Sequence, residues 1–318
     1  MHTSVTIDAS RPGLWAVVLA GGQGVRLRSL VSRIYGEERP KQYAALLDSR
    51  TLLRQTLDRV ALGVPPERTV VVTLERHAHY LAGEGRAEDG PHLLRQPKDL
   101  GTAAGVLWPA HWIRSRDLTA TMAVFPSDHF VLEEDRFIGH VAAVARFVAQ
   151  HPQWIVLLGV EPTYAETEYG WIQPGEPLGS AGGGWLHRIR RFCEKPSAEM
   201  AGGLLSAGWL WNTFVIVATV STLIEAGRAC LPRLHDRLSA IGAFAGTEDE
   251  PWAVRQAYAL APRANFARAV LEVCPRPLAV ATMPDVTWCD LGTPARVART
   301  LTGLGKSLPW GAQLGPTA

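Results

Sequence analysis

The distribution of apolar residues along the chain predicts a sheet covered by helices. Short runs rich in β-branched residues alternate with longer segments in which apolar residues recur at helical spacing. Several short runs are almost continuously apolar, as in strands covered on both faces. This alternation is typical of an α/β fold whose twisted, mostly parallel sheet carries helices on both faces. We predict strands at Leu14–Ala20, Thr69–Leu74, Thr121–Phe125, Trp154–Val160, Trp185–Phe192, Trp211–Ala218 and Leu278–Met283.

The segments between these strands predict helices and loops of one domain. Stretches 170–184 and 201–208 are rich in glycine, the first also in proline, and are expected to be loops or lids. Neither an internal repeat nor a low-complexity linker divides the sequence. We expect a flexible N-terminus at 1–13, a single domain at 14–304 and a loose tail at 305–318. Helical periodicity is found at Leu52–Ala61, Thr102–Ile113, Asp135–Ala149 and Ala253–Tyr258.

Composition narrows the classes of partner and compartment. The chain has 318 residues and a formal net charge of +2, which argues against a basic nucleic-acid-binding surface and favours small-molecule partners. The first apolar run, Leu14–Ala20, is too short for a signal-peptide core or a membrane span. We therefore expect a cytoplasmic protein that binds neither nucleic acid nor membrane. The cysteines form no CxxC pair, so reduced thiols are expected at Cys193, Cys230, Cys274 and Cys289.

A glycine-rich segment follows the first predicted strand. Gly21, Gly22 and Gly24 permit a sharp turn and a close approach of backbone N–H groups to phosphate oxygens. Two cations follow, Arg26 in the loop and Lys41 in a Pro-Lys-Gln segment, and both suit phosphate. The glycine spacing matches neither the dinucleotide-binding fingerprint nor the P-loop. The alternative is an ordinary tight turn between a strand and a helix.

Two aspartates follow apolar runs far apart in the sequence. Asp128 comes after a predicted strand, where the carboxyl ends of parallel strands form a ligand-binding crevice. Asp290 precedes a predicted helix at Pro294–Leu301. Each aspartate has an alternative role as a cap of a following helix. His129 is expected to pack or hydrogen-bond beneath the site.

Three further segments carry polar residues beside aromatic ones. Glu194 and Lys195 end a predicted strand, where a solvated ion pair is the simplest interpretation. Gly170 precedes Trp171, and Asn212 follows Trp211. Core packing is the expected role of the two tryptophans, although sugar sites also use flat apolar faces beside a few polar contacts.

The order of these motifs resembles that of the sugar-1-phosphate nucleotidylyltransferases, especially their mannose-1-phosphate guanylyltransferase branch. The resemblance rests first on Gly-Gly-x-Gly-x-Arg-Leu followed by Pro-Lys-Gln, and extends from about Leu14 to Leu301. It implies a single-domain Rossmann-like fold of the GT-A type. It also implies that the loop and its arginine hold a triphosphate, while the lysine contacts the α-phosphate. These roles fall to Gly21, Gly22, Gly24, Arg26 and Lys41.

The remaining motifs imply the metal, sugar and base contacts. Pro-Ser-Asp-His and Trp-x-Asp-x-Gly resemble the segments that bind Mg²⁺, which assigns the metal to Asp128 and Asp290. In Glu-Lys-Pro the lysine would bind the sugar phosphate and the glutamate a sugar hydroxyl. The base loop resembles the guanylyl pattern but carries glutamine before its proline, which leaves guanine open against uracil or thymine. The implied sugar contacts are Gly170, Glu194 and Asn212, and the implied nucleotide contacts include Gln96, Gly101 and Thr102.

Four departures from the family pattern bear on the substrate contacts. Val25 stands where threonine is usual, and Arg28-Ser29 replaces Trp-Pro. The segment Val31–Glu38 lengthens the loop before the Pro-Lys-Gln segment. Phe214 replaces a glycine and should narrow the sugar pocket.

The expected activity joins a nucleoside triphosphate to a sugar-1-phosphate and releases pyrophosphate. GTP and mannose-1-phosphate are the favoured substrates and GDP-mannose the product, with catalysis by Arg26, Lys41, Asp128 and Lys195. One alternative is uridylyl or thymidylyl transfer to glucose-1-phosphate; another is a non-catalytic regulator that binds sugar nucleotides. A dehydrogenase is disfavoured by the glycine spacing. Whether the protein forms a homo-oligomer stays open.

Overall fold

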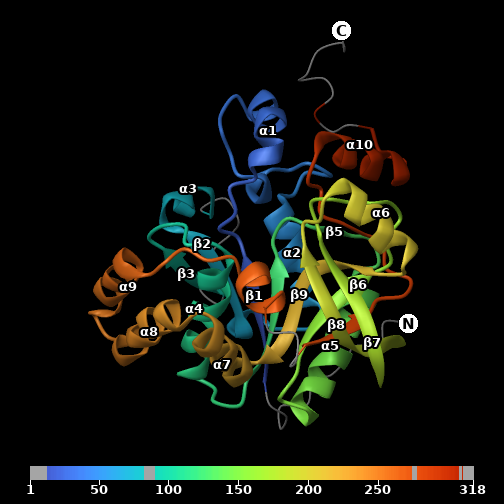
Figure 1. Ribbon diagram of the computed structural model, residues 1–318. Helices are drawn as coiled ribbons and strands as arrows, with labels where there is room; N and C mark the ends of the chain where they lie inside the picture. Colours follow the sequence, from blue (N-terminus) through green and yellow to red (C-terminus); the bar gives the residue numbers. More distant parts are fainter. Residues whose placement is uncertain (1–12, 82–89, 274–277, 308–309, 311–318) are drawn as a thin grey trace.

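The computed structural model describes residues 13–81, 90–273, 278–307 and 310. Nine strands of this part form one sheet in the order β3-β2-β1-β4-β9-β6-β10-β8-β7 (Figure 1). Strands β9 and β8 run opposite to the other seven. The predicted α/β fold with a mostly parallel sheet is therefore confirmed. The strands are β1 (Leu14–Leu19), β2 (Thr69–Leu74), β3 (His92–Gln96), β4 (Thr121–Pro126), β6 (Ile155–Val160), β7 (Gly170–Ala181), β8 (Gly184–Glu194), β9 (Leu210–Thr219) and β10 (Leu278–Thr282).

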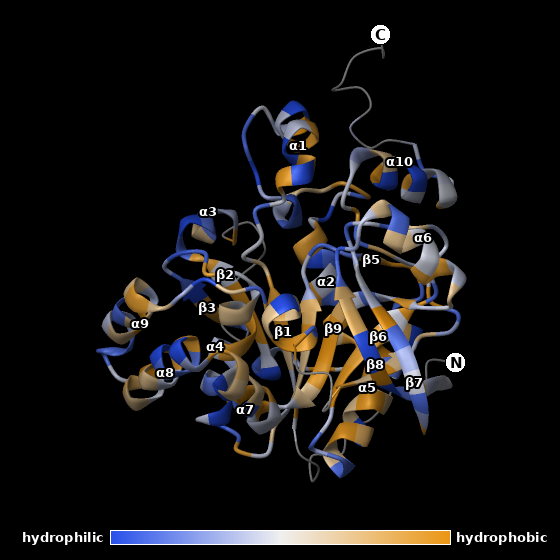
Figure 2. Cartoon of the chain, viewed as in Figure 1, coloured by the Kyte–Doolittle hydropathy of each residue, from blue (hydrophilic) through white to orange (hydrophobic). Residues whose placement is uncertain are grey.

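Helices cover both faces of the sheet because alternate strand residues point to opposite sides. In β1, Val17 packs into the cluster under α4, α7, α8 and α9, while Ala16 and Val18 pack into the cluster under α2 and α5. Figure 2 shows the apolar strands between these two layers. The helices are α1 (Arg28–Tyr35), α2 (Leu52–Ala61), α3 (Ala78–Leu81), α4 (Thr102–Arg114), α5 (Glu134–Gln150), α6 (Ala198–Ser206), α7 (Val220–Cys230), α8 (Pro232–Ser239), α9 (Glu250–Leu260) and α10 (Pro294–Gly303).

A third apolar cluster lies at the carboxyl edge of the parallel strands. It joins α1 to α10, which stand next to each other at the top of Figure 1 although they are far apart in the sequence. Trp310 is buried against the same cluster, and its indole N–H donates to the Leu46 carbonyl at 3.3 Å. The cluster thus holds the segment after the glycine loop against the segment after Asp290.

Two of the predicted loops are wrong. Stretch 170–184 is mostly strand β7, which pairs with β8 along its length and with β9 at its start, where Trp171 lies opposite Trp211. Pro174 and Pro177 fit because β7 ends the sheet order and its register with β8 shifts at both prolines. Stretch 201–208 mostly belongs to α6, whose N-cap Ser197 accepts a hydrogen bond from the Met200 N–H.

Several expectations concern residues outside the described part. Most of the predicted flanking segments, 1–13 and 305–318, and the thiol of Cys274 lie there, so the proposed domain limits stay predictions. Within the described residues, no helix is both long enough and apolar enough to cross a membrane.

Candidate active site

A pocket of about 480 Å³ lies beside the glycine-rich segment that leaves β1. Of the residues predicted to bind nucleotide, five line it: Gly21, Gly22, Gln96, Gly101 and Thr102. They come from the loop after β1, the end of β3 and the start of α4. The pocket therefore adjoins the N-terminus of α4, a setting that favours anionic ligands.

Gln96 is fixed within this pocket by a residue that the sequence analysis did not single out. The hydroxyl of Tyr258, on α9, donates to Gln96 Oε1 at 3.1 Å, and Tyr258 is fully buried. Burial raises the pKa of Tyr258 well above its usual value, so the hydroxyl keeps its proton. With Oε1 held in this way, the Gln96 amide presents its N–H donors toward the side of Gly21.

One more segment, which the sequence analysis did not identify, lines this pocket. Arg263, Ala264 and Asn265 line it and are joined to the base of α4 by two backbone hydrogen bonds. The Thr102 hydroxyl accepts from the Phe266 N–H at 2.9 Å. These contacts connect segments more than 150 residues apart, and nothing in the local sequence signals them.

Gly24, the sixth predicted nucleotide residue, contacts Lys41 instead of lining the pocket. Its φ of +59° is left-handed, and a Cβ there would lie 2.8 Å from the Lys41 backbone nitrogen. A side chain at position 24 would therefore be strained and would push against Lys41. Glycine at this position places the lysine directly beneath the loop.

Lys41 lies between the two predicted metal ligands. Its buried ammonium forms an ion pair with Asp128 Oδ2 at 3.2 Å and a hydrogen bond with the backbone carbonyl of Asp290. A short antiparallel pairing between β5 (Phe130–Val131) and β11 (Trp288–Cys289) brings the two aspartates together. The alternative role of Asp290 as a helix cap is wrong, because Thr293 caps α10.

The Asp290 carboxylate is held from several sides. Its Oδ1 accepts from the Tyr169 hydroxyl at 2.6 Å, from Arg296 at 2.7 Å and from the Gly292 N–H at 2.9 Å. Burial would raise the pKa of Asp290, but the charge of Lys41 and these hydrogen bonds outweigh it and hold the pKa well below its usual range. Arg296 also forms an ion pair with Glu166, and both side chains are buried.

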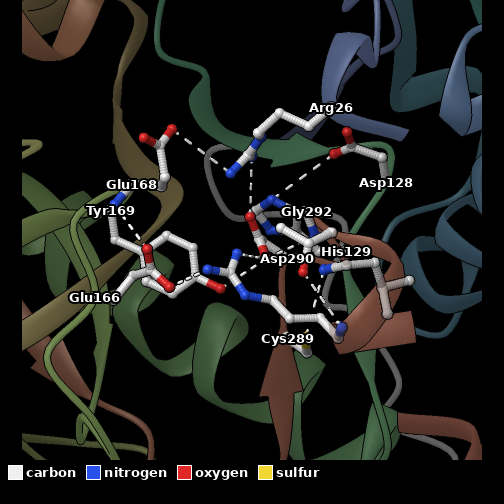
Figure 3. Close-up of polar contacts among 12 residues, drawn as sticks. Arg26, Asp128, His129, Glu166, Glu168, Tyr169, Cys289, Asp290 and Gly292 are labelled. Carbon is white, nitrogen blue, oxygen red and sulfur yellow. Dashed lines mark hydrogen bonds and ion pairs between the residues drawn. The ribbon is translucent and has the colours of Figure 1, made fainter. Parts of the chain in front are cut away.

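Arg26 and Lys195, the two exposed predicted cations, share one carboxylate. Glu168 Oε2 lies 3.1 Å from Lys195 Nζ and 3.7 Å from an Arg26 nitrogen. Arg26 also contacts Asp290 Oδ2 at 3.2 Å, so it bridges Glu168 and Asp290, as Figure 3 shows. One cation expected to contact each substrate thus lies beside Glu168.

The three predicted sugar-binding residues also meet. Gly170 opens β7 opposite Glu194, the last residue of β8. A Cβ on Gly170 would lie 2.9 Å from Glu194 Oε2 and 3.3 Å from Asn212 Cβ, so glycine is needed for their close approach. Burial raises the pKa of Glu194. Phe214, which stands in place of a glycine, has a left-handed φ of 59°, and its N–H donates to Asn212 Oδ1 at 3.0 Å.

The aromatic residues and His129 have structural environments. Trp171 and Trp211 are buried, which confirms core packing for both. The Trp288 indole N–H donates to His129 Nδ1 at 3.3 Å, and the two rings meet edge to face. Burial lowers the pKa of His129 to about 4, so the ring is neutral near pH 7 beneath Asp128.

Two relatives with known names match most of this chain. A mannose-1-phosphate guanylyltransferase of Sinorhizobium fredii is 30% identical over 295 residues, covering 90% of this chain and 54% of that protein. The xanthan biosynthesis protein XanB of Xanthomonas campestris is 29% identical over 284 residues, covering 87% and 57%. The chain thus spans about half the length of the curated relatives it matches.

Solved structures share the fold. A Thermus thermophilus protein described as a mannose-1-phosphate geranyltransferase superposes with a TM-score of 0.74 at 29% identity, covering 88% of this chain and 76% of that one. A UDP-glucose pyrophosphorylase of Acinetobacter baumannii superposes with a TM-score of 0.57 at 15% identity, covering 92% and 93%, and shows the fold alone. The profile of the nucleotidyl transferase family matches residues 15–302, so the chain belongs to this family.

Proposed function

We propose that this protein transfers a nucleotidyl group from a nucleoside triphosphate to a sugar-1-phosphate, with GTP and mannose-1-phosphate as substrates. The observation that carries the proposal is the position of Arg26, Glu168 and Lys195. Arg26 follows the glycine loop that lines the pocket of the predicted nucleotide residues, and Lys195 directly follows Glu194 of the sugar cluster, so their shared carboxylate links the two. Two anionic substrates bound on its two sides would meet at these cations.

The chemistry needs positioning and charge neutralisation more than acid–base groups. The phosphate of a sugar-1-phosphate is already ionised near neutral pH and can attack the α-phosphorus in line. A new P–O bond forms there as the bond to the bridging α–β oxygen breaks, and pyrophosphate leaves with that electron pair. Lys41 and Arg26 would hold the triphosphate and Lys195 the attacking phosphate. Catalysis would then come from aligning two groups that otherwise repel each other.

Charge balance supports a divalent cation at this site. The contact network of the site contains four cations and four carboxylates, so it has no net positive charge left for the added phosphates. A divalent cation such as Mg²⁺ would supply that charge. The members of the network are Arg26, Lys41, Lys195 and Arg296 with Asp128, Glu166, Glu168 and Asp290.

Asp128 and Asp290 are the residues that we propose to hold the metal. Among the described residues, no group of three or more His, Cys, Asp or Glu side chains is arranged to hold an ion. Two carboxylates are fewer ligands than Mg²⁺ takes, so the other ligands would have to come from outside the protein. Asp290 Oδ2 faces Arg26, whose side chain is 43% exposed and can turn to a phosphate when substrate binds.

The orientation of Gln96 favours bases that present a carbonyl oxygen. Its amide N–H donors can bind guanine O6 or the O4 of uracil and thymine, whereas adenine and cytosine present amino groups there. The names of the relatives favour guanine within this set. Uridylyl or thymidylyl transfer to glucose-1-phosphate remains the alternative enzyme. A non-catalytic regulator is less consistent with the intact set of charges around Lys41.

Pyrophosphate release tests the proposal. Purified protein with Mg²⁺ is assayed with GTP, UTP, dTTP, ATP and CTP, each with mannose-1-phosphate or glucose-1-phosphate. We expect release with GTP and mannose-1-phosphate. The Asp128→Asn variant should lose nearly all turnover, and Lys195→Ala should mainly impair use of the sugar phosphate. Release with another pair would change the substrates, and nucleotide binding without release from any pair would favour the regulator.

A further inference from the structure

A second hollow lies on the other side of the glycine loop. It measures about 330 Å³, and its polar lining includes Gln23, Arg28 and Arg39, then Arg76 and His79, with Glu38 as its one carboxylate among the described residues. The first three belong to the loop, to α1 and to the segment after α1; the other two belong to the turn after β2 and to α3. Both α1 and α3 stand at the carboxyl edge of the sheet (Figure 1). We refer to this hollow as the arginine pocket.

Arg39 lines this pocket and is held in place by its neighbours. Its guanidinium lies 4.3 Å from the ring centre of Tyr35 and 5.3 Å from that of Tyr80, and it forms an ion pair with Glu37 at 2.7 Å. The Tyr80 hydroxyl donates to the Glu38 carbonyl at 2.9 Å, which ties α3 to the segment after α1. The pocket therefore has a shape set by packing, while Arg39 itself is largely neutralised.

The other two arginines leave an excess of positive charge. Arg28 is exposed and has Glu38 as a distant ion-pair partner at 3.8 Å. Arg76 is also exposed, and within the described residues no carboxylate lies within ion-pair distance of it. His79 adds a further ring nitrogen at the rim, whereas burial lowers the pKa of the neighbouring His77 to about 4 and keeps it neutral. A hollow lined mainly by one sign of charge concentrates counter-ions, so it suits an anion.

The glycine loop connects the arginine pocket to the pocket of about 480 Å³ that Gln96 lines, which we refer to as the base pocket. The Gln23 side chain, which lines the arginine pocket, donates to Asp99 Oδ2 at 3.2 Å, and Asp99 lines the base pocket. Pro40, also at the edge of the arginine pocket, directly precedes Lys41. The arginine pocket therefore shares the glycine loop with the base pocket and adjoins Lys41 in the sequence, on the path that we expect for a chain of phosphates leaving the base pocket.

We propose that the arginine pocket binds a diphosphate: the β- and γ-phosphates of the nucleoside triphosphate, or the pyrophosphate that they become. This inference rests on the proposed function for the identity of the ligand. Arg28 and Arg76 are its binding residues, and a guanidinium is suited to two phosphate oxygens at once. Arg28 and Glu38 belong to segments in which this chain departs from the family motif, and the resemblance assigns neither residue a role.

The test measures binding of inorganic pyrophosphate by calorimetry in the presence of Mg²⁺, which needs no turnover. The variants are Arg28→Gln and Arg76→Gln, with Arg33→Gln, an exposed arginine of the same helix α1 that does not line the pocket, as control. Each pocket variant loses a charge-assisted hydrogen-bonding group and should bind pyrophosphate about tenfold more weakly. The control should bind like the unmodified protein.

Steady-state kinetics then separate the two sources of diphosphate. A parallel rise in KM for the nucleoside triphosphate, with an unchanged KM for the sugar-1-phosphate, would place its distal phosphates in the pocket. Weaker pyrophosphate binding with an unchanged KM for the triphosphate would assign the pocket to the free product. Pyrophosphate affinity equal to that of Arg33→Gln in both pocket variants would overturn the inference. If the unmodified protein turned over no substrate pair but the variants still lost pyrophosphate binding, the proposed activity would fail and the pocket would stand.

Discussion

Replacement of Arg296 by methionine tests how the buried charges of the site are held. The guanidinium contacts Asp290 Oδ1 at 2.7 Å, pairs with Glu166 and lies 4.9 Å from the ring centre of Tyr169. Only about a tenth of each of the three charged side chains is exposed. Methionine keeps much of the volume of the arginine stem but removes its charge and its five N–H donors.

The free energy of unfolding should fall strongly in Arg296→Met, mainly because Glu166 is left without its cation. Asp290 keeps the Tyr169 hydroxyl, the Gly292 N–H and Arg26 as partners. Glu166 keeps the backbone N–H of Glu168, at 2.8 Å, but loses its only cation among the described residues. Removing one partner of a buried ion pair costs about 3–5 kcal/mol. At ~2 °C per kcal/mol for a chain of this size, the melting temperature should fall by about 6–10 °C.

Urea denaturation of four proteins would measure this effect: the unmodified chain, Arg296→Met, Glu166→Gln and the double variant. Because Glu166→Gln removes the carboxylate that Arg296→Met leaves unpaired, the double variant should be more stable than the sum of the single losses by at least ~1 kcal/mol. Arg299→Met, at an exposed position of the same helix α10, is the control; it loses a contact with the Tyr164 ring at 5.8 Å and should change stability by no more than about 1 kcal/mol. An Arg296→Met variant within ~1 kcal/mol of the unmodified protein, or strictly additive losses, would refute the reasoning.

Two further predictions concern base selection and acid stability. Tyr258→Phe removes the donor to Gln96 Oε1, so the amide can turn. The preference for GTP over ATP, measured as the ratio of the two kcat/KM values, should then fall about tenfold. An unchanged ratio would show that Tyr258 does not orient Gln96. Burial, reinforced by the neighbouring His235, lowers the pKa of His111 to about 4 from 6.5, so the ring is neutral in the fold and charged in the unfolded chain between these values. The stability that it contributes is present above about pH 6.5 and is lost, by up to about 3 kcal/mol, as the pH falls toward 4. The difference between the free energies of unfolding at pH 7.5 and pH 4.5 should therefore be smaller in His111→Gln, and an equal difference would contradict the shift.

The strands could be predicted because burial on two faces produces apolar runs. Leu14–Ala20 and Leu278–Met283 each extend one residue or less beyond the observed strands at either end. β7 could not be predicted in this way. It lies at the end of the sheet, so it tolerates prolines and exposed polar residues that mimic a loop. Strands of this kind are recognised by what pairs with them, and that information is not local.

The same limit applies to the site. The glycine-rich loop and the segments around Asp128 and Lys195 could be predicted from the local sequence. Their residue types are those that turn the chain sharply or suit a phosphate. Tyr258 and Arg296 act through partners on other elements, at separations of 162 and 130 residues. A lone tyrosine or arginine inside a helix has no pattern that distinguishes it from a core or surface residue. Only the tertiary structure reveals their contacts.

The backbone of the site supports this division between local and distant constraints. Four non-glycine residues in the described part of the chain have a left-handed φ, and three of them, Lys195, Phe214 and Leu291, adjoin the sugar or metal residues. Each such conformation costs of the order of 1 kcal/mol or more, and it persists only where the surroundings impose it. At Lys195 the backbone N–H donates to the Tyr169 carbonyl while the ammonium reaches Glu168, so the unusual turn is what lets one residue contact both. The strained backbone at Lys195 therefore accompanies the placement of its ammonium. Phe214→Gly should relieve the backbone strain at position 214. It should not disturb Asn212, because the Asn212 side chain accepts from the backbone N–H of residue 214, which glycine keeps.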